Sequence, residues 1–343
     1  MEVRVPAYYD SFRCLAGECP HTCCAKWEVV IDEETARRYG EVPGPLGEEL
    51  RAALQYDGDG DACFPLSGDR CPFLDSEGLC RIHKQLGEAA TSVTCQEHPR
   101  FTEDYGTFRE ITLSASCPAA NELLLGSREP LTLRTFETEE PRGECDPWVP
   151  YLLPLRARMM EILADRRQPL RRRLREFLLL AGEAQLCLEE EQTDRLPGLA
   201  ETWQAPETAE EEEESCLVID GLRLLGTLEV LDADWPSVLE QAETAPAVDL
   251  PEELLERIAV YFAFRYLLKT VNDGDLLGRA KLCVFGVLMA ERLAAVCGLP
   301  EALRRFSCEV EHDDGSLDAL LETFRSGALP PAAFLRTLKE NER

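Results

Sequence analysis

Cysteine is the residue type in this sequence whose number and spacing point most directly to chemistry. Four cysteines fall within eleven positions near the start of the chain, and two of them are adjacent: Cys14, Cys19, Cys23 and Cys24. Four more follow at Cys71, Cys80, Cys95 and Cys117. Thiolates are the preferred ligands of zinc and of iron–sulfur clusters, and short loops can direct several sulfurs toward one centre. We therefore predict that these eight residues bind metal.

Disulfide bonds are the competing explanation for so many cysteines. The chain contains 15 cysteines, which is an odd number, and its first six residues lack the apolar segment of a secretory signal. Disulfides persist mainly in exported proteins. We therefore expect a cytoplasmic protein with reduced thiols. No run of about 18 apolar residues is present, so we expect no membrane-spanning segment.

The charge of the chain restricts its partners. The formal net charge is -29, and residues 1–150 and 151–343 contribute -14 and -15 of it. An acidic surface repels phosphate backbones, which argues against nucleic-acid binding. A cationic partner, such as a protein surface that presents lysine, would be attracted instead.

Secondary-structure signals in residues 1–145 place the cysteines at the ends of elements. A β-branched run at 28–32 predicts a strand, and Asp32 then predicts the N-cap of a helix over 33–39. The segment 71–80 predicts a tight hairpin with a cysteine at each end. The alternating run 108–114 predicts a strand that leads to Cys117. We expect a small, irregular α+β domain over residues 1–145.

From Trp148 onward the apolar residues recur at three- and four-residue intervals, which is typical of helices. We predict a helical domain over residues 146–343, with an acidic linker or loop at about 197–216. No glycine-rich loop follows a clear strand, so a Rossmann-type cofactor site is not expected. The predicted fold class is mainly α, with the cysteine-rich α+β domain in front of a helical, non-Rossmann domain.

The order of short motifs along the first 120 residues resembles the flagellin lysine-N-methylase (FliB-type) family, within a wider group with a CxxCxxCC-like cysteine signature. The matching motifs are Phe12-x-Cys14, Cys19-Pro20-x-x-Cys23-Cys24-x-x-Trp27, Ile31-Asp32, Cys71-Pro72-Phe73-Leu74, Leu79-Cys80, Thr94-Cys95, His98-Pro99-Arg100 and Ser116-Cys117-Pro118. The spacing here is wider than the bare signature, because four residues separate the first two cysteines and three separate the next two. The run Tyr261–Leu268 resembles the C-terminal part of the same family.

This resemblance implies methyl transfer from S-adenosylmethionine to lysine side chains of a protein, flagellin above all, and hence a role in the bacterial flagellum. It also implies an iron–sulfur cluster, of the 4Fe–4S type, held by the N-terminal cysteines. Zinc is the alternative metal. The residues alone leave open one cluster plus a structural zinc, two clusters, or one site with spare thiols.

Four further residues are candidates for binding a cofactor: Trp27, Arg100, Tyr261 and Arg265. An indole ring can stack on a cofactor, and a guanidinium can hold a carboxylate with two hydrogen bonds. Tyr261 and Arg265 are four positions apart and therefore share a helix face. Each has a structural alternative, in the core for the aromatic residues and in an ion pair for Arg100. The sequence identifies no catalytic base.

The remaining cysteines lie outside the matching motifs. We expect Cys63 to be a free thiol, leave Cys145 unassigned, and expect the others to behave as small buried apolar residues: Cys187, Cys216, Cys283, Cys297 and Cys308. A function of a different class also fits these observations. It is a non-enzymatic zinc- or iron–sulfur-binding protein whose helical half binds a partner.

Overall fold

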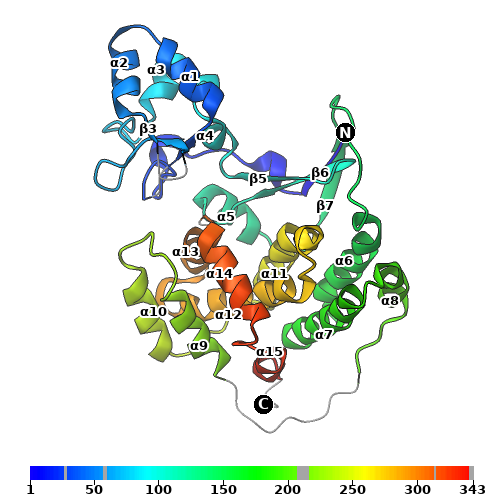
Figure 1. Cartoon of the computed structure of the whole chain (residues 1–343). Helices are drawn as coiled ribbons and strands as arrows, with labels where there is room; N and C mark the ends of the chain where they lie inside the picture. The colour runs from blue at the N-terminus through cyan, green and yellow to red at the C-terminus, as the bar shows by residue number, and fades with distance from the viewer. Residues whose placement is uncertain (27–28, 57–59, 207–215, 313, 340–343) are drawn as a thin grey trace. The chain divides into compact units, whose positions relative to one another are not determined.

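The structure is a computed structural model that describes residues 1–26, 29–56, 60–206, 216–312 and 314–339. Its contacts divide the chain into two compact units. The cysteine unit contains Ser11–Phe101 and Leu113–Asn121. The helical unit contains Met1–Asp10, Thr102–Thr112 and Glu122–Arg343. The elements of both units carry their labels in Figure 1.

The predicted domain boundary near residue 145 differs from this division, and β-sheet pairing is the reason. The helical unit includes the chain's first ten residues, in which strand β1 (Glu2–Pro6) pairs with β7 (Leu133–Glu137). It also includes most of β6 (Phe108–Leu113), which pairs with β1 in parallel. The partners of strand β1 are more than 100 residues away in the sequence. A domain boundary predicted from one continuous stretch of sequence cannot include such pairing.

The cysteine unit consists of short helices and a small sheet. Asp32 caps helix α1 as predicted, and its side chain accepts a hydrogen bond from the backbone N–H of Thr35. Strands β2, β4 and β3 form a three-stranded antiparallel sheet in that order. In chain order the elements of this unit are the 3-10 helix η2 (Ala16–Glu18), β2 (Val30–Ile31), α1 (Glu33–Glu41), α2 (Gly44–Ala53), β3 (Gln55–Tyr56), β4 (Ala62–Cys63), α3 (Arg81–Leu86), the 3-10 helix η3 (Glu88–Ala90) and α4 (Val93–Glu97). The 3-10 helix η1 (Tyr9–Ser11) precedes them, and its first two residues belong to the helical unit.

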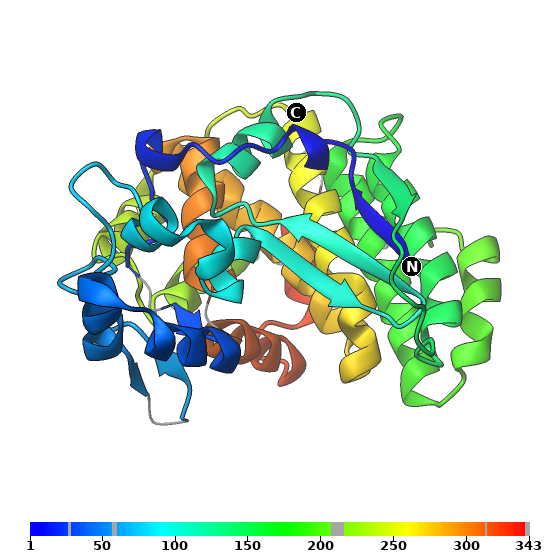
Figure 2. The same cartoon turned by 90° about the horizontal axis from the view of Figure 1, so that it is seen from above.

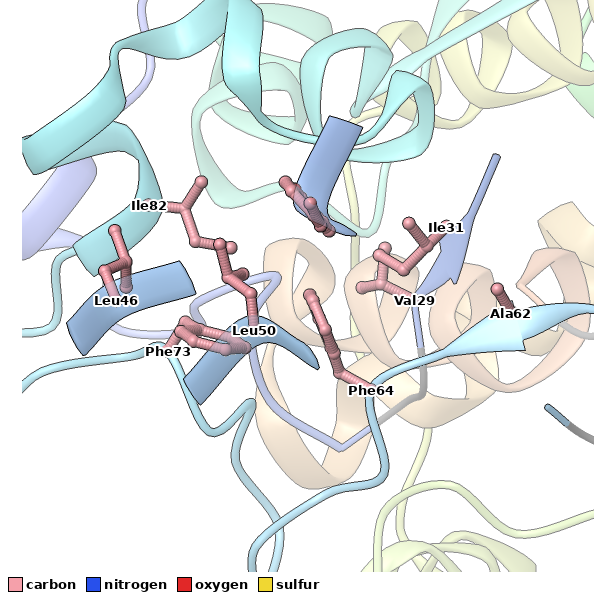
Figure 3. Close-up of a cluster of buried hydrophobic side chains, with 9 residues drawn as sticks. Val29, Ile31, Leu46, Leu50, Ala62, Phe64, Phe73 and Ile82 are labelled. Carbon is pink, nitrogen blue, oxygen red and sulfur yellow. The ribbon is translucent and has the colours of Figure 1, made fainter. Parts of the chain in front are cut away.

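A hydrophobic core holds the cysteine unit together (Figure 3). Its buried side chains come from the sheet, from both helices α1 and α2, and from the segment between the later cysteines: Val29, Ile31, Tyr39, Leu46, Leu50, Ala62, Phe64, Phe73 and Ile82. Phe64 stacks on Tyr39 and packs against Phe73, with ring centres 5.7 Å and 4.7 Å apart. Cys71 and Cys80 pack against this core. The core therefore fixes the position of part of the predicted metal-binding set.

A four-stranded sheet with the order β5-β6-β1-β7 lies mainly in the helical unit. Its outer strand β5 spans Arg100–Asp104. Strand β1 pairs in parallel with β6, and Glu2 lies opposite Phe108 in this pair. On its other side β1 pairs antiparallel with β7, where Glu2 lies opposite Glu137. The N-terminal ammonium donates hydrogen bonds to the carbonyl oxygens of Thr138 and Glu140, at 2.7 Å and 2.8 Å. These bonds fix the start of the chain beside β7.

Helices make up most of the described chain, which confirms the mainly α prediction. They are α5 (Pro118–Leu125), α6 (Val149–Ala164), α7 (Leu170–Glu189), α8 (Leu196–Thr202), α9 (Leu217–Leu225), α10 (Trp235–Thr244), α11 (Glu252–Tyr266), α12 (Leu276–Cys297), α13 (Leu299–Glu311), α14 (Asp314–Arg325) and α15 (Pro331–Thr337), with 3-10 helices η4 (Thr193–Arg195) and η5 (Leu267–Asn272). Helices α11 and α12 form the centre of this unit, and nearly all of their residues are buried. Helices α6, α7 and α8 lie side by side, as the green segments of Figure 2 show.

Two of the sequence expectations need correction in this half. The predicted linker at 197–216 begins inside helix α8, whose residues Leu196 and Ala200 are buried. Its acidic part, residues 207–215, lies outside the described residues. Cys216 is exposed, although we expected it to be buried, because it is the residue that precedes the first turn of α9. Among the described residues, no helix has both the length and the apolar composition needed to cross a bilayer.

Candidate functional site

All eight predicted metal-binding cysteines lie in the cysteine unit, and none of them forms a disulfide. The wider set of described cysteines contains no disulfide either. Among the described residues, no three or more Cys, His, Asp or Glu side chains are placed so that they could hold a metal ion together. The structure thus presents reduced sulfur donors without a completed coordination shell.

The loop that contains the first four cysteines has an unusual backbone. Ala16 and Lys26 have φ angles of 48° and 74°, in the left-handed region that residues other than glycine rarely adopt. The backbone N–H of Ala16 points at the sulfur of Cys14, with the nitrogen 3.3 Å from Sγ. The backbone N–H of Cys19 donates to the carbonyl oxygen of Ala16 at 3.1 Å. One turn of 3-10 helix, η2, therefore separates Cys14 from Cys19 and fixes their spacing.

The predicted hairpin at 71–80 is present and is held by Asp75. Its carboxylate accepts hydrogen bonds from the backbone N–H groups of Glu77 and Leu79, both at 2.9 Å. Leu74 then pairs with Cys80, and Gly78 supplies the left-handed residue of the turn with a φ of 74°. This geometry is the physical reason for the Asp-Ser-Glu-Gly sequence, since Asx turns and glycine favour such reversals.

The hairpin is attached to both halves of the first cysteine loop. The backbone N–H of Cys71 donates to the carbonyl oxygen of Cys24 at 2.8 Å. A Cβ atom at Gly17 would lie 2.9 Å from the carbonyl oxygen of Glu77, so only glycine fits without a shift of the backbone. Loop and turn therefore pack closely, and residues 47 and 60 positions apart in the chain are brought together.

Cys95 and Cys117, the last two predicted metal-binding cysteines along the chain, lie in or beside helices. Cys95 is in α4, whose first turn is capped by Ser92; the Ser92 hydroxyl accepts from the backbone N–H of Cys95 at 3.2 Å. Cys117 immediately precedes α5, and burial raises the pKa of its thiol. Hydrogen bonds from the backbone N–H groups of Ala120 and Ala119 oppose this increase but are weaker than the effect of burial.

The thiols influence one another electrostatically. Burial is the main cause that raises the pKa of Cys71 to about 12, and the neighbouring thiols of Cys24, Cys80 and Cys95 act in the same direction. The pKa of Cys95 is raised to about 11, first by burial and then also by Cys24 and Cys80. Each thiolate therefore destabilises the next one, and a bound cation would remove this repulsion.

The adjacent pair behaves differently, because one thiol donates a hydrogen bond to the other. The Cys23 thiol donates to the sulfur of Cys24, and this bond lowers the pKa of Cys24 to about 7, although burial opposes it. The same hydrogen bond raises the pKa of Cys23, and burial adds to the effect. Cys24 thus loses its proton more readily than Cys23, and the thiolate is the form that binds metal.

The chemistry of these donors fits an iron–sulfur cluster or zinc. Both are held by thiolates, and backbone N–H groups directed at the sulfurs are typical of the outer shell around such centres. Here such N–H groups point at Cys14 and affect the pKa of Cys71, Cys80 and Cys117. The donor type therefore fits such a group, and the binding itself stays a prediction.

Arg100, one of the four predicted cofactor-binding residues, contacts an aromatic ring in the structure. The guanidinium of Arg100 lies over the ring of Phe12, 5.4 Å from its centre, within the cysteine unit. Trp27 lies outside the described residues. His21 and His83, which flank cysteines, are exposed. The role of Arg100 toward a cofactor stays a prediction.

Tyr261 and Arg265 share a face of α11, as their spacing predicted, but this face is buried inside the helical unit. Tyr261 is 1% exposed and Arg265 is 5% exposed. Both contact the carboxylate of Glu311, at 3.2 Å from the Tyr261 hydroxyl and 2.8 Å from Arg265 Nε. The hydroxyls of Tyr266 and Ser307 donate to the same carboxylate. These side chains form a buried polar network around Glu311.

Sequence reasoning missed Glu311, because it belongs to an acidic stretch that reads as a solvated helix end. The one local signal is its spacing of four residues from Ser307, which places both on one face of α13. The next residue, His312, is partly buried, and its pKa is lowered to about 4, mainly by burial and also by Arg265. His312 is therefore neutral near pH 7.

The surface cavities among the described residues of the helical unit include two of similar volume. The first, of about 350 Å³, has polar and charged walls near the start of α12: Gln185, Glu189, Asp273, Asp275, Lys281 and Arg325. The second, of about 330 Å³, has mainly apolar walls with charged residues at its rim, and includes Arg171, Val218, Ile219, Val248, Leu288 and Glu291. Neither cavity is lined by a cysteine.

Comparison with known proteins gives three curated relatives. The chain is 28% identical over 137 residues to the flagellar biosynthetic protein FliU of Salmonella muenchen, covering 38% of this chain and 81% of that protein. It is equally similar to the lysine-N-methylases of Salmonella typhimurium and Salmonella choleraesuis, and this match spans about a third (34%) of their length. These matches confirm the resemblance to the lysine-N-methylase family. No protein-family model and no solved structure matches the chain.

Proposed function

We propose that this protein transfers methyl groups from S-adenosylmethionine to lysine side chains of a protein substrate, with an iron–sulfur cluster held by its N-terminal cysteines. Flagellin is the proposed substrate, because relatives carry the names lysine-N-methylase and flagellar biosynthetic protein. The observation that carries the proposal is the set of eight cysteines, none of them in a disulfide, in one compact unit of a chain similar to those relatives.

The reaction sets clear physical requirements. The lysine amine must be neutral, because an ammonium has no lone pair, so the enzyme must lower its pKa from about 10.4 or remove its proton. The amine nitrogen then attacks the methyl carbon of the sulfonium. As the new C–N bond forms, the C–S bond breaks, its electrons stay on sulfur, and a thioether leaves. The product ammonium loses its extra proton to a base, and the three reacting atoms must lie in line.

The chain's own residues contribute to this reaction in two proposed ways. Its net charge of -29 attracts a cationic, lysine-bearing segment and raises the rate of encounter. The cysteines would hold the cluster, and the backbone N–H groups directed at their sulfurs would orient those ligands. When bound, the cluster would supply a site that binds or positions the methyl donor.

A methylation assay tests the proposal. We would purify the chain without oxygen, reconstitute it with iron and sulfide, and incubate it with flagellin and isotopically labelled S-adenosylmethionine. Label on flagellin lysines, located by mass spectrometry, is the expected result. Replacing Cys24 by Ser should lower both the cluster absorbance and the methylation rate by at least about tenfold, since even the loss of an outer-shell partner of a metal costs that much.

Cys216→Ser is the matched control, because this thiol is exposed, free and in the helical unit. It should leave the absorbance and the methylation rate unchanged. Full methylation by iron-free protein would contradict the role of the cluster. Metal binding without transfer of label to any protein lysine, and without binding of S-adenosylmethionine in calorimetry, would instead support a non-enzymatic metal-binding protein.

A further inference from the structure

The charged cavity at the start of α12 lies wholly within the helical unit. Its walls come from the end of α7, the start of α12, the end of α14 and the first residue of α15, helices that are labelled in Figure 1. Its volume of about 350 Å³ is within the range of about 300–1,000 Å³ that is typical of small-molecule sites. Its lining contains charged side chains of both signs, so these charges decide which molecule it suits.

Lys281 brings a positive charge to the wall of this cavity and is only 3% exposed. Its ammonium donates hydrogen bonds to the carbonyl oxygens of Phe324 and Leu329, at 2.8 Å and 3.2 Å. No carboxylate of the described residues forms an ion pair with it. Burial lowers the pKa of Lys281, and the charge of Asp275 only partly opposes this effect. An ammonium has three N–H donors, so one is left for an anionic partner, and a buried charge is costly without one.

Glu189 brings a negative charge to the same cavity from the last turn of α7. In the described part of the chain, its exposed carboxylate contacts the side-chain amide of Gln185, at 3.3 Å, and no cationic group. The last turn of α7 contains no basic residue, and the helix dipole presents its negative end there. This edge of the cavity therefore favours a cation.

The other charged side chains of the cavity are already paired with one another. Arg325 lies 3.2 Å from a carboxylate oxygen of Asp275 and 3.5 Å from one of Asp273. Asp273 also pairs with Arg279, at 2.6 Å. The lysine ammonium and the glutamate carboxylate are thus the charged groups of the lining that have no oppositely charged partner among the described residues.

We propose that this cavity binds the amino-acid group of a small molecule, with Lys281 holding the α-carboxylate and Glu189 holding the α-ammonium. The rest of the lining includes Leu277, Phe324 and Pro331, which suit an apolar side chain such as that of methionine. Free methionine and S-adenosylmethionine both carry this group. The first source goes beyond the proposed function, and the second rests on it, because S-adenosylmethionine is the methyl donor proposed there.

Calorimetry of the full chain with methionine and with S-adenosylmethionine tests the site. Lys281→Gln keeps N–H donors for the two carbonyl groups but removes the positive charge. Each ligand that binds the natural protein should bind Lys281→Gln at least about tenfold more weakly, because the loss of one member of a buried charge pair has an effect of at least that size. Methionine methyl ester, which lacks the carboxylate charge, should bind weakly and should not distinguish the two proteins.

Glu189→Gln tests the other end of the ligand. It should weaken binding of the two ligands about threefold, as expected for an exposed charge pair. It should leave the binding of N-acetylmethionine, which has no ammonium, unchanged. Glu183→Gln is the matched control, because Glu183 is exposed on the same helix and does not line the cavity. These two surface variants carry the test if circular dichroism shows that Lys281→Gln has lost its fold.

The two sources of the amino-acid group are separated by 5′-methylthioadenosine, which lacks the amino-acid end of S-adenosylmethionine and should not respond to Lys281→Gln. Binding of S-adenosylmethionine without methionine, with the expected loss in Lys281→Gln, assigns the cavity to the methyl donor. Binding of methionine alone, with the same loss, supports the cavity and contradicts the proposed donor.

Binding of neither ligand to the natural protein would overturn the site. Equal affinities of the natural protein and a folded Lys281→Gln variant for both ligands would also overturn it. If S-adenosylmethionine binds in that second case and flagellin lysines are methylated, the proposed function stands and only the assignment of the cavity fails.

Discussion

Two residues beside the cysteines, Ala16 and Lys26, hold their backbone in the left-handed region, with φ angles of 48° and 74°. This conformation costs an L-residue other than glycine about 1–2 kcal/mol. Such strain persists only where surrounding contacts impose it, and it is concentrated at functional sites. Here the hydrogen bond from Ala16 to the Cys14 sulfur and the close packing of Gly17 on Glu77 impose it.

Ala16→Gly should therefore stabilise the cysteine unit. Glycine adopts this backbone conformation at little cost, so we expect a gain of about 1 kcal/mol in the free energy of unfolding. Chemical denaturation of the metal-free protein, followed by circular dichroism, measures the effect. The same substitution at Ala52, an exposed residue inside helix α2, should instead cost about 1 kcal/mol. Equal losses at both sites would show that Ala16 is not strained.

At the scale of elements, Asp32 connects two helices of the cysteine unit. One oxygen of its carboxylate accepts from the Thr35 N–H at the start of α1, and the other accepts from the Val93 N–H at the start of α4, both at 2.9 Å. Helix α4 contains Cys95. Partial burial acts to raise the pKa of Asp32, but the backbone hydrogen bonds from Val93 and Thr35 outweigh it, and the pKa is lowered.

Asp32→Ala should cost about 1–2 kcal/mol, because it removes a helix cap and a second hydrogen bond. The carboxylate is the form that accepts both bonds, and its pKa is lower in the folded protein than in the unfolded chain. Its contribution is therefore complete above the unfolded pKa of about 3.9 and is lost as the pH falls through the folded pKa. Denaturation of the natural protein and of Asp32→Ala at pH 7 and near pH 2 measures this difference.

The gap in stability between the two proteins should shrink at the acidic pH. A gap that is the same at both values would contradict the role of the charged carboxylate. Glu33→Ala, at the next residue along the chain, is a suitable control because the Glu33 side chain is exposed. This substitution should change stability by less than about 1 kcal/mol.

Buried ion pairs organise the helical unit as a whole. Glu110 of β6 and Arg156 of α6 are 3% and 5% exposed and form two hydrogen bonds of 2.5 Å. Arg173 pairs with Glu256, and Arg265 with Glu311, in the same buried manner. A charge in a protein interior is costly unless its partner is present, so each pair fixes which elements must be neighbours.

Arg156→Met should destabilise the helical unit by about 3–5 kcal/mol, since it leaves a buried carboxylate without its main partner. Adding Glu110→Gln should recover part of this loss. Calorimetric thermal midpoints of the single and double variants measure both effects. Arg158→Met, on the same helix, breaks an exposed pair with Glu161 and should cost less than about 1 kcal/mol. Equal losses for Arg156→Met and Arg158→Met would contradict this account.

The sequence by itself determined the features that depend on neighbouring residues. It identified the eight thiols, the cap at Asp32, the hairpin at 71–80, the helical second half and the resemblance that the curated relatives confirm. Caps, turns and helical periodicity arise from contacts within about four positions, so they can be read directly from local order.

Only the tertiary structure decided which distant residues meet. It placed β1 beside β7, put Tyr261 and Arg265 into a buried network with Glu311, and brought Cys24 to the hairpin. These groupings depend on packing between segments far apart in the chain, and a spacing of residues along one segment has no information about its partner. Which thiols lie near one another is therefore a property of the fold, while their presence is a property of the sequence.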